Sequence, residues 1–164
     1  MIKKLILVLF LVFIGGCGED KIDVKSINVE SSNVHSDLSK GNYVLDSNSK
    51  LTYEATRIAG RPHIGTVDIK SGRLENGKGE FLFDMNTITD SRNSERYLNH
   101  VKSKDFFDVE NFPEAKFLIK SISNGKIIGE LTILGRTHEI EFFSVMDGLN
   151  AKADFEIDRT RWGI

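Results

Sequence analysis

Residues able to do nucleophilic, acid–base or metal chemistry are spread thinly along this chain. The four histidines are isolated, and none lies near another histidine or a cysteine at metal-ligand spacing: His35, His63, His100 and His138. No Gly-x-Ser-x-Gly elbow occurs, and the glycines near residue 77 are not followed by the lysine and helix start of a phosphate-binding loop. We therefore expect no metal, no cofactor and no catalytic centre.

Two charged pairs flank aromatic residues. Asp105 and Asp108 border a phenylalanine-rich stretch, where a solvated, helix-ending role is favoured over acid–base work. Arg159 and Arg161 either bind the head group of a ligand or pair with Asp158 and cover the wall of the fold, and the second role is favoured.

The stretch from 100 to 117, HVKSKDFFDVENFPEAKF, sets four phenylalanines among charged and amide side chains. A solvated loop has no use for so many aromatic rings, and Pro113 is incompatible with a core helix. Phe106, Phe107 and Phe112 either roof an apolar interior or pack a short helix onto the fold. Phe117 is expected inside the strand that follows.

The first 17 residues read as a lipoprotein leader. A basic start precedes ten apolar residues, 5–14, too few to span a bilayer but typical of a signal-peptide core. Ile14-Gly15-Gly16-Cys17 then resembles the bacterial lipobox. We expect residues 1–16 to be removed and Cys17 to carry lipid. An ordinary secretory signal or a transmembrane anchor is disfavoured.

Cys17 is the chain's single cysteine, so no intramolecular disulfide can form. Each buried acyl CH₂ contributes roughly 0.8 kcal/mol, and two or more chains anchor a protein stably. Gly18, and not aspartate, follows the cysteine, which slightly favours the outer membrane. The expected location is the periplasmic side of the envelope.

Charge argues against a nucleic-acid partner. The chain has 22 Lys and Arg against 24 Asp and Glu, and removal of the leader takes away two of the lysines. The charges are interspersed, with no basic stripe. Residues 17–40 are polar, lack aromatics and are predicted to be a flexible tether, which leaves 41–164 as one domain.

The domain contains turn sequences that are typical of antiparallel hairpins. Asn76-Gly77, Asn124-Gly125 and Asp147-Gly148 each separate two β-rich runs and supply the positive φ angles of tight turns. Apolar residues alternate with polar ones in most runs. Strands are predicted at 42–47, 50–59, 63–72, 79–89, 115–123, 126–134, 138–146 and 150–158, the first two being compatible with one bent strand.

One segment departs from this pattern. Asp90-Ser91 is expected to cap a short helix over 92–102 with a narrow apolar stripe. A meander of sequential hairpins favours a closed barrel over a sandwich. The fold class is therefore all-β: an antiparallel barrel of about eight strands, with one short helix between the fourth and fifth strands. The interior of such a barrel is either filled by side chains or holds one small ligand.

Three blocks of sequence resemble the YceI-like family of exported lipid-binding proteins. They are NHVKSKDFFDVENFPEAKF, IIGELTILGRTHEIEF and FEIDRTRWGI, and they occur in the family's order. The similarity covers about residues 42–164. Val101 stands where the family usually has leucine. Family members usually continue past the last block with another loop and strand, so the end at Ile164 predicts an open sheet edge.

The resemblance implies a lipocalin-like barrel holding a polyisoprenoid or similar long-chain amphiphile, such as a prenylated quinone, and no enzymatic activity. The side chains expected to face that ligand are Phe81, Phe83, Met85, Phe106, Phe107, Phe117, Ile119, Leu131, Ile133, Ile140, Phe142, Phe155 and Ile157. Partners are then an isoprenoid lipid and the membrane.

Two alternatives remain. One is a small barrel enzyme acting on a lipid or quinone through Asp105, His100 or Arg159. The other is a structural envelope lipoprotein with a solid interior. Small residues on presumed inner faces, such as Gly129, Ala151 and Ala153, favour a hollow barrel over a solid one.

Overall fold

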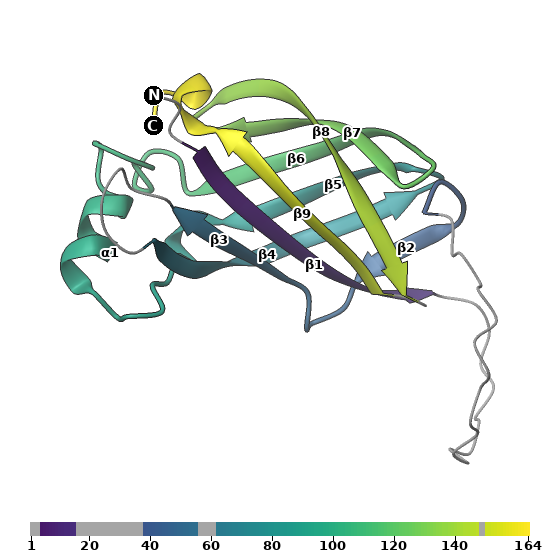
Figure 1. The fold of residues 1–164 in the computed structure, drawn as a ribbon, viewed down its shortest axis with the longest axis horizontal. Coiled ribbons are helices and arrows are strands. Elements are labelled where there is room, and N and C mark those ends of the chain that lie inside the picture. The colour runs from purple at the N-terminus through teal and green to yellow at the C-terminus, as the bar shows by residue number, and fades with distance from the viewer. Residues whose placement is uncertain (1–3, 16–37, 56–61, 148–149) are drawn as a thin grey trace, which may run out of the picture.

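The computed structural model describes residues 4–15, 38–55, 62–147 and 150–164, and for residues 4–15 it describes the course of the main chain. Nine strands and one α-helix form a strongly curled sheet (Figure 1). The strands are β1 (Lys4–Gly15), β2 (Asn42–Leu45), β3 (Lys50–Ala55), β4 (His63–Glu75), β5 (Lys78–Asp84), β6 (Glu114–Ser123), β7 (Lys126–Ile133), β8 (Arg136–Asp147) and β9 (Asn150–Asp158). The helices are the 3-10 turn η1 (Met85–Thr87), α1 (Glu95–Lys102) and the 3-10 turn η2 (Arg159–Trp162).

Every strand from β3 to β8 pairs antiparallel with the next one along the chain. β2 and β3 both pair with β4, at opposite ends of that long strand, so together they act as one bent strand. The helix α1 lies between β5 and β6, which are the fourth and fifth strands after β1. The predicted antiparallel barrel with a short helix at this point is confirmed.

The strand β1 comes from the predicted leader and lies between β3 and β9 (Figure 1). Lys4 to Val12 pair with Asp158 to Asn150, and Leu5 to Phe10 pair with Ala55 to Lys50. With β1 in this place, the sheet edge predicted to be open is occupied. Cleavage of residues 1–16 stays a prediction.

Two of the predicted hairpin turns form as expected. Asn76 and Gly77 have φ of 48° and 76°, and Asn124 and Gly125 have φ of 50° and 76°. Gly148, in the third predicted turn, lies outside the described residues. A further tight turn joins β7 to β8 through Leu134 (φ 52°) and Gly135. The predicted strands leave a connection over 135–137, but Leu134 was assigned to the strand, because leucine rarely adopts a positive φ.

The end of one predicted strand and the start of the predicted helix are wrong. The strand expected over 79–89 ends at Asp84, whose carboxylate accepts from the Asn86 amide and begins η1. The helix expected at residue 92 begins at Glu95, because the Ser94 hydroxyl accepts from the Tyr97 amide and caps it. Asp90, the predicted cap, makes other contacts described below.

Most core side chains come from the inner faces of the strands. β6 and β7 alternate buried and half-buried residues along most of their length, as the period-two pattern predicted. Of the predicted tether, Leu38 is buried in the core, so the ordered domain begins before residue 41. Two ends can be distinguished: a helix end with η1, α1 and η2, and a turn end with the two Asn-Gly turns.

Candidate functional site

An apolar cavity of about 40 Å³ lies in the barrel beneath the helix end. The side chains that line it come from five strands, η1 and the segments around α1: Leu51, Tyr53, Val67, Phe83, Met85, Ile88, Phe107, Ala115, Leu131 and Ile133. Its one polar group is the Tyr53 hydroxyl, which donates to the carbonyl of Thr89, 2.6 Å away. We call this space the helix-end cavity.

A smaller cavity of about 10 Å³ lies near the turn end. Its lining is Leu38, Leu74, Ile119, Ile122, Ile127, Phe142, Ser144, Ala151, Lys152 and Ala153. The Ser144 hydroxyl donates to the carbonyl of Gly125 and so does not need a partner inside. We call this space the turn-end cavity.

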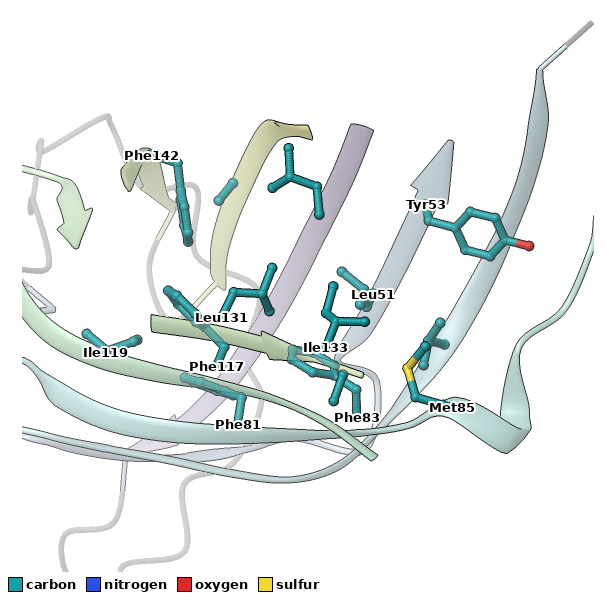
Figure 2. Packing of buried hydrophobic residues seen from close by; sticks show 14 of the residues in the cluster. Leu51, Tyr53, Phe81, Phe83, Met85, Phe117, Ile119, Leu131, Ile133 and Phe142 are labelled. Carbon is teal, nitrogen blue, oxygen red and sulfur yellow. The ribbon is translucent and has the colours of Figure 1, made fainter. Parts of the chain in front are cut away.

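Phenylalanine rings separate the two cavities. On β6, Ala115 lines one cavity and Ile119 the other, with Phe117 between them. A Cβ on Gly129 would lie 2.7 Å from the Phe117 ring, so that glycine makes room for the ring and leaves no hollow. Figure 2 shows Phe81 and Phe117 in this middle layer, between Ile119 and Phe83. The prediction that Gly129 marks empty space is therefore wrong, because the Phe117 ring fills the space beside it.

Every side chain predicted to face a ligand lies in the core or against it. Buried are Phe81, Phe83, Met85, Phe107, Phe117, Ile119, Leu131, Ile133, Phe142 and Ile157. Partly buried and packed against these are Phe106, Ile140 and Phe155. Their inward placement follows from alternation, but contact with a ligand stays a prediction.

The phenylalanine-rich stretch divides its rings between two tasks. Phe107 is buried and lines the helix-end cavity, so it roofs the interior. Phe106 packs edge-on against Phe107 and receives the Arg159 guanidinium over its face, 5.0 Å from the ring centre. Phe112 is 37% exposed and lies over the β7–β8 turn at Gly135.

The end of the chain covers the barrel wall. Trp162 is fully buried, and its indole N–H donates to the carbonyl of Leu131. Asp158 accepts from the amide and hydroxyl of Thr160, and these bonds hold the pKa of its carboxyl below the ordinary value. The expected pairing of Arg159 and Arg161 with Asp158 is replaced by this local cap.

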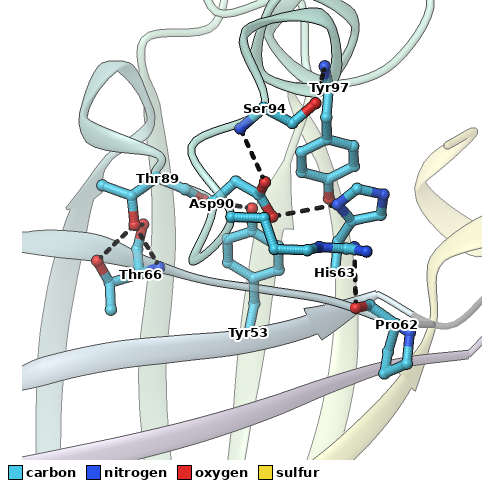
Figure 3. Close-up of polar contacts among 9 residues, drawn as sticks. Tyr53, Pro62, His63, Thr66, Thr89, Asp90, Ser94 and Tyr97 are labelled. Carbon is cyan, nitrogen blue, oxygen red and sulfur yellow. Dashed lines mark hydrogen bonds and ion pairs between the residues drawn. The ribbon is translucent and has the colours of Figure 1, made fainter.

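A polar cluster of His63, Asp90, Ser94 and Tyr97 lies beside Tyr53 (Figure 3). His63 Nδ1 is 3.1 Å from an Asp90 carboxylate oxygen, and the other oxygen accepts from the Ser94 amide. The Tyr97 ring stacks on the His63 ring, with centres 3.6 Å apart and planes within 2°. These contacts fix the position and the plane of the imidazole.

The cluster brings together residues from a strand, a loop and a helix. Gly65 on β4 makes this possible, since a Cβ there would meet the Thr89 carbonyl oxygen. Burial works against charge on Asp90, but hydrogen bonds from His63 and Ser94 outweigh it and hold the pKa of Asp90 below its ordinary value. Burial and the neighbouring Tyr97 hydroxyl raise the pKa of Tyr53, which keeps its proton for Thr89.

Beside this cluster is an open cleft of about 670 Å³, lined by His63, Arg92, Ser94, Arg96, Tyr97 and His100. We call it the cationic cleft. Arg92 donates to the carbonyl of Pro62, while for Arg96 no hydrogen bond or ion pair is found with the described residues. Sequence inspection missed this site, because His63 lies 27 residues before Asp90 and no local spacing links them.

Residues proposed for the alternative enzyme only partly meet. His100 and Arg159 both contact the Phe106 ring, and Asp105 is exposed. Within the described residues no group of three or more His, Cys, Asp or Glu could hold a metal ion. Among those same residues, no helix is both long and apolar enough to cross a membrane.

Comparison with known proteins identifies the family. A sequence model of the YceI-like domain matches residues 26–164. The chain belongs to the YceI-like family. This match begins within the predicted tether, in agreement with the burial of Leu38.

Named relatives of this YceI-like chain match over shorter stretches. A UPF0312 protein of Staphylococcus aureus (strain USA300) is 38% identical over 66 residues, which are 40% of this chain and 36% of the relative. One of Staphylococcus epidermidis is 38% identical over 61 residues, 37% of this chain and 35% of that protein. The match thus spans about a third of each relative's length.

A solved structure is also similar. The crystal structure of a YCEI protein of Campylobacter jejuni aligns with a TM-score of 0.39 and 18% identity, over 79% of this chain and 64% of that one.

The predicted leader cleavage and lipid attachment at Cys17 concern residues outside the described ranges, apart from β1.

Proposed function

We propose that this YceI-like protein is an exported, lipid-anchored binding protein that holds a polyisoprenoid or similar long-chain amphiphile and catalyses no reaction. The helix-end cavity is the observation that carries the proposal. Its lining is apolar, and its single hydroxyl is already bonded to Thr89. A space with these walls favours a hydrocarbon chain over a polar ligand.

The cavities of the unprocessed chain are too small for such a ligand. Pockets that bind small molecules usually have about 300–1,000 Å³, against about 40 and 10 Å³ here. The strand β1 lies in the wall between β3 and β9. Cleavage of the leader would remove this strand and open a slot beside the buried side chains of Leu51, Tyr53, Ala153 and Ile157. The processed protein is therefore the proposed binding form.

The expected free energy of lipid transfer from membrane to protein is compatible with a carrier. Each buried CH₂ contributes about 0.8 kcal/mol, so eight isoprene units would contribute tens of kcal/mol gross. Non-covalent affinities stop near −18 to −21 kcal/mol, so the membrane's solvation of the same chain must offset most of this. The net free energy of transfer from membrane to protein is then close to zero, which permits both loading and release.

The test compares processed protein with protein that keeps its leader. Both are purified, and organic extracts are examined by mass spectrometry. We expect an isoprenoid-type lipid in the extract of the processed protein and much less in that of the leader-bearing protein. Repeated absence of lipid from both forms would overturn the proposal.

A structural envelope lipoprotein is the second candidate, and the middle layer of Phe81 and Phe117 favours it. These rings lie between the two cavities, which share no lining residue. This alternative predicts that the processed protein binds no lipid and that its interior stays filled, which the same extracts would show.

A further inference from the structure

The most exposed large apolar side chains in the described part of the chain lie at the turn end. Phe143 and Val145 on β8 are 66% and 71% exposed, and Val44 on β2 is 54% exposed. At the helix end, Ile64 and Phe112 are 41% exposed or less. Apolar side chains that gather on one part of a surface mark a contact with a protein or a membrane, so the turn end is the place to look for one.

Two of these side chains form a patch on the outer wall of the barrel. Along β8, Phe142 is buried and Ser144 lines the turn-end cavity, so alternation turns Phe143 and Val145 outward together. We call these two residues the β8 patch. They lie on the last third of β8, close to the hairpin that joins β8 to β9 (Figure 1).

The charges around the β8 patch are balanced. The residues opposite its two members in the strand register are Lys126 on β7 and Lys152 on β9. Their ammonium groups lie 2.9 Å from the Glu141 carboxylate and 3.3 Å from the Asp154 carboxylate. A contact made by this patch would therefore depend on apolar burial and little on the charge of the partner.

The turn end is also where the chain leads to the predicted lipid anchor. Leu38 lies 21 residues after Cys17 and lines the turn-end cavity together with Ser144, the residue between the two members of the β8 patch. A flexible chain of that length spans roughly 25 Å. The helix end is farther away by about the length of β8, roughly 40 Å for its twelve residues. A membrane that holds Cys17 is therefore nearer to the β8 patch than to α1.

A membrane fits the β8 patch better than a second copy of this chain does. A stable protein–protein contact buries about 800 Å² on each partner. An aromatic side chain contributes about 150–250 Å², so the two residues of the patch fall short of that area. A tether raises the effective concentration of the lipid surface, so a weak contact is enough to orient an anchored domain.

We infer that the β8 patch docks onto the lipid surface in which Cys17 is anchored, with Phe143 and Val145 at the boundary between head groups and acyl chains. This inference rests on the lipid anchor of the proposed function and is independent of what the barrel holds. It places the turn end of the barrel on the membrane and the helix end away from it.

The experiment places a tryptophan in the β8 patch. The processed, acylated Phe143→Trp protein is bound to vesicles of phosphatidylethanolamine and phosphatidylglycerol, with or without bromine on the acyl chains. Bromine quenches tryptophan at contact distance, and the chain's own Trp162 is fully buried, so wild type supplies the background. We expect brominated lipid to lower the emission of the added tryptophan at least about twofold, because the ring enters the acyl boundary.

Phe112→Trp is the matched control, since it places the same probe on an exposed phenylalanine at the helix end. Its emission should not change with bromine. Val145→Asp, added to Phe143→Trp, should remove most of the quenching, because a carboxylate is costly to bury among acyl chains. Vesicles of phosphatidylcholine alone should quench Phe143→Trp equally, since the lysines beside the patch are paired. Urea unfolding of each variant verifies that the fold is intact.

Three outcomes would overturn the docking and leave the anchored binding protein in place. One is the absence of quenching at Phe143→Trp in vesicle-bound protein, and another is stronger quenching at Phe112→Trp. The third is a blue shift of the Phe143→Trp emission that grows with protein concentration in the absence of lipid, which would mean that a second copy covers the patch. Quenching that requires phosphatidylglycerol would also contradict an apolar contact.

The anchor itself is tested separately by the mass of the processed protein. If Cys17 carries no acyl chain, the anchoring part of the proposed function is wrong. The same vesicles are then offered to the unanchored protein, where quenching at Phe143→Trp would still support the docking surface. The absence of both acylation and quenching would overturn the two together.

Discussion

The two ends of the barrel are built in opposite ways. At the turn end, Asn76-Gly77 and Asn124-Gly125 close hairpins with two residues each, and the closure needs only main-chain conformation. At the helix end, the connection from Met85 to Pro113 carries η1, α1 and the aromatic stretch, and it contains the buried Asp90. Ionisable side chains can be assembled where the connection is long, since a two-residue turn offers no place to bury them.

The middle layer between the ends gives the largest expected effect. Phe117→Ala should lower the free energy of unfolding by about 3–5 kcal/mol, because the lost ring leaves a void between the two cavities. The variant should also bind longer lipids than the wild-type protein does. Urea unfolding and mass spectrometry of bound lipid are the measurements.

Phe143→Ala is the control for that change, since Phe143 on β8 is 66% exposed. Its stability should stay within about 0.5 kcal/mol of wild type. A loss below about 1 kcal/mol for Phe117→Ala would mean that the two cavities are not separated by this ring.

The buried carboxylate of the helix end gives the next effect. Asp90→Asn should cost about 1–3 kcal/mol at pH 7, because the amide has a single accepting oxygen and cannot accept from both His63 and Ser94 as the carboxylate does. Urea unfolding monitored by Trp162 fluorescence measures it. Asp68→Asn, an exposed aspartate on β4, should change little.

The difference in stability between wild type and Asp90→Asn should decrease as the pH falls. The pKa of Asp90 is lower in the folded than in the unfolded protein, so its contribution to stability is complete above the ordinary aspartate value of about 3.9. The contribution disappears as the pH falls from there through the folded-state value. Wild type and Asp90→Asn should therefore converge below about pH 4, and a gap that widens with acid would contradict the assignment.

The turn end should respond to main-chain conformation alone. Asn124→Ala should destabilise by roughly 1 kcal/mol, since alanine tolerates the φ of 50° less well than asparagine. Asn99→Ala, on the exposed face of α1, should not destabilise. Equal losses for both variants in urea unfolding would show that the turn conformation is not responsible.

The smallest effect is expected where η2 meets the aromatic stretch. Arg159→Gln removes the cation above the Phe106 ring and should cost about 0.5–1 kcal/mol. Thermal unfolding at low salt measures it, with Arg73→Gln as the exposed control. If Phe106→Leu abolishes the effect of Arg159→Gln in a double-mutant cycle, the ring contact accounts for it.

The strands of the second half of the domain could be predicted closely, because alternation and Asn-Gly turns are local signals. β6 and β9 begin and end within one residue of expectation. Met85 misled the prediction, since its buried side chain continues the alternation although the main chain has already turned into η1. Leu134 misled the prediction in the opposite way. It belongs to the β7–β8 turn, but leucine gives no turn signal and was therefore assigned to the strand.

The sequence by itself determined the family, the antiparallel strands and the inward face of each, because these follow from residue types two to four positions apart. Only the tertiary structure decided how the lumen is divided, what lies between β3 and β9, and which charges meet. Phe117 and Gly129, or His63 and Asp90, come from different elements of the fold, and pairing of the strands sets which side chains meet. Local pattern contains no information on such distances, so the cationic cleft emerges only once the barrel has formed.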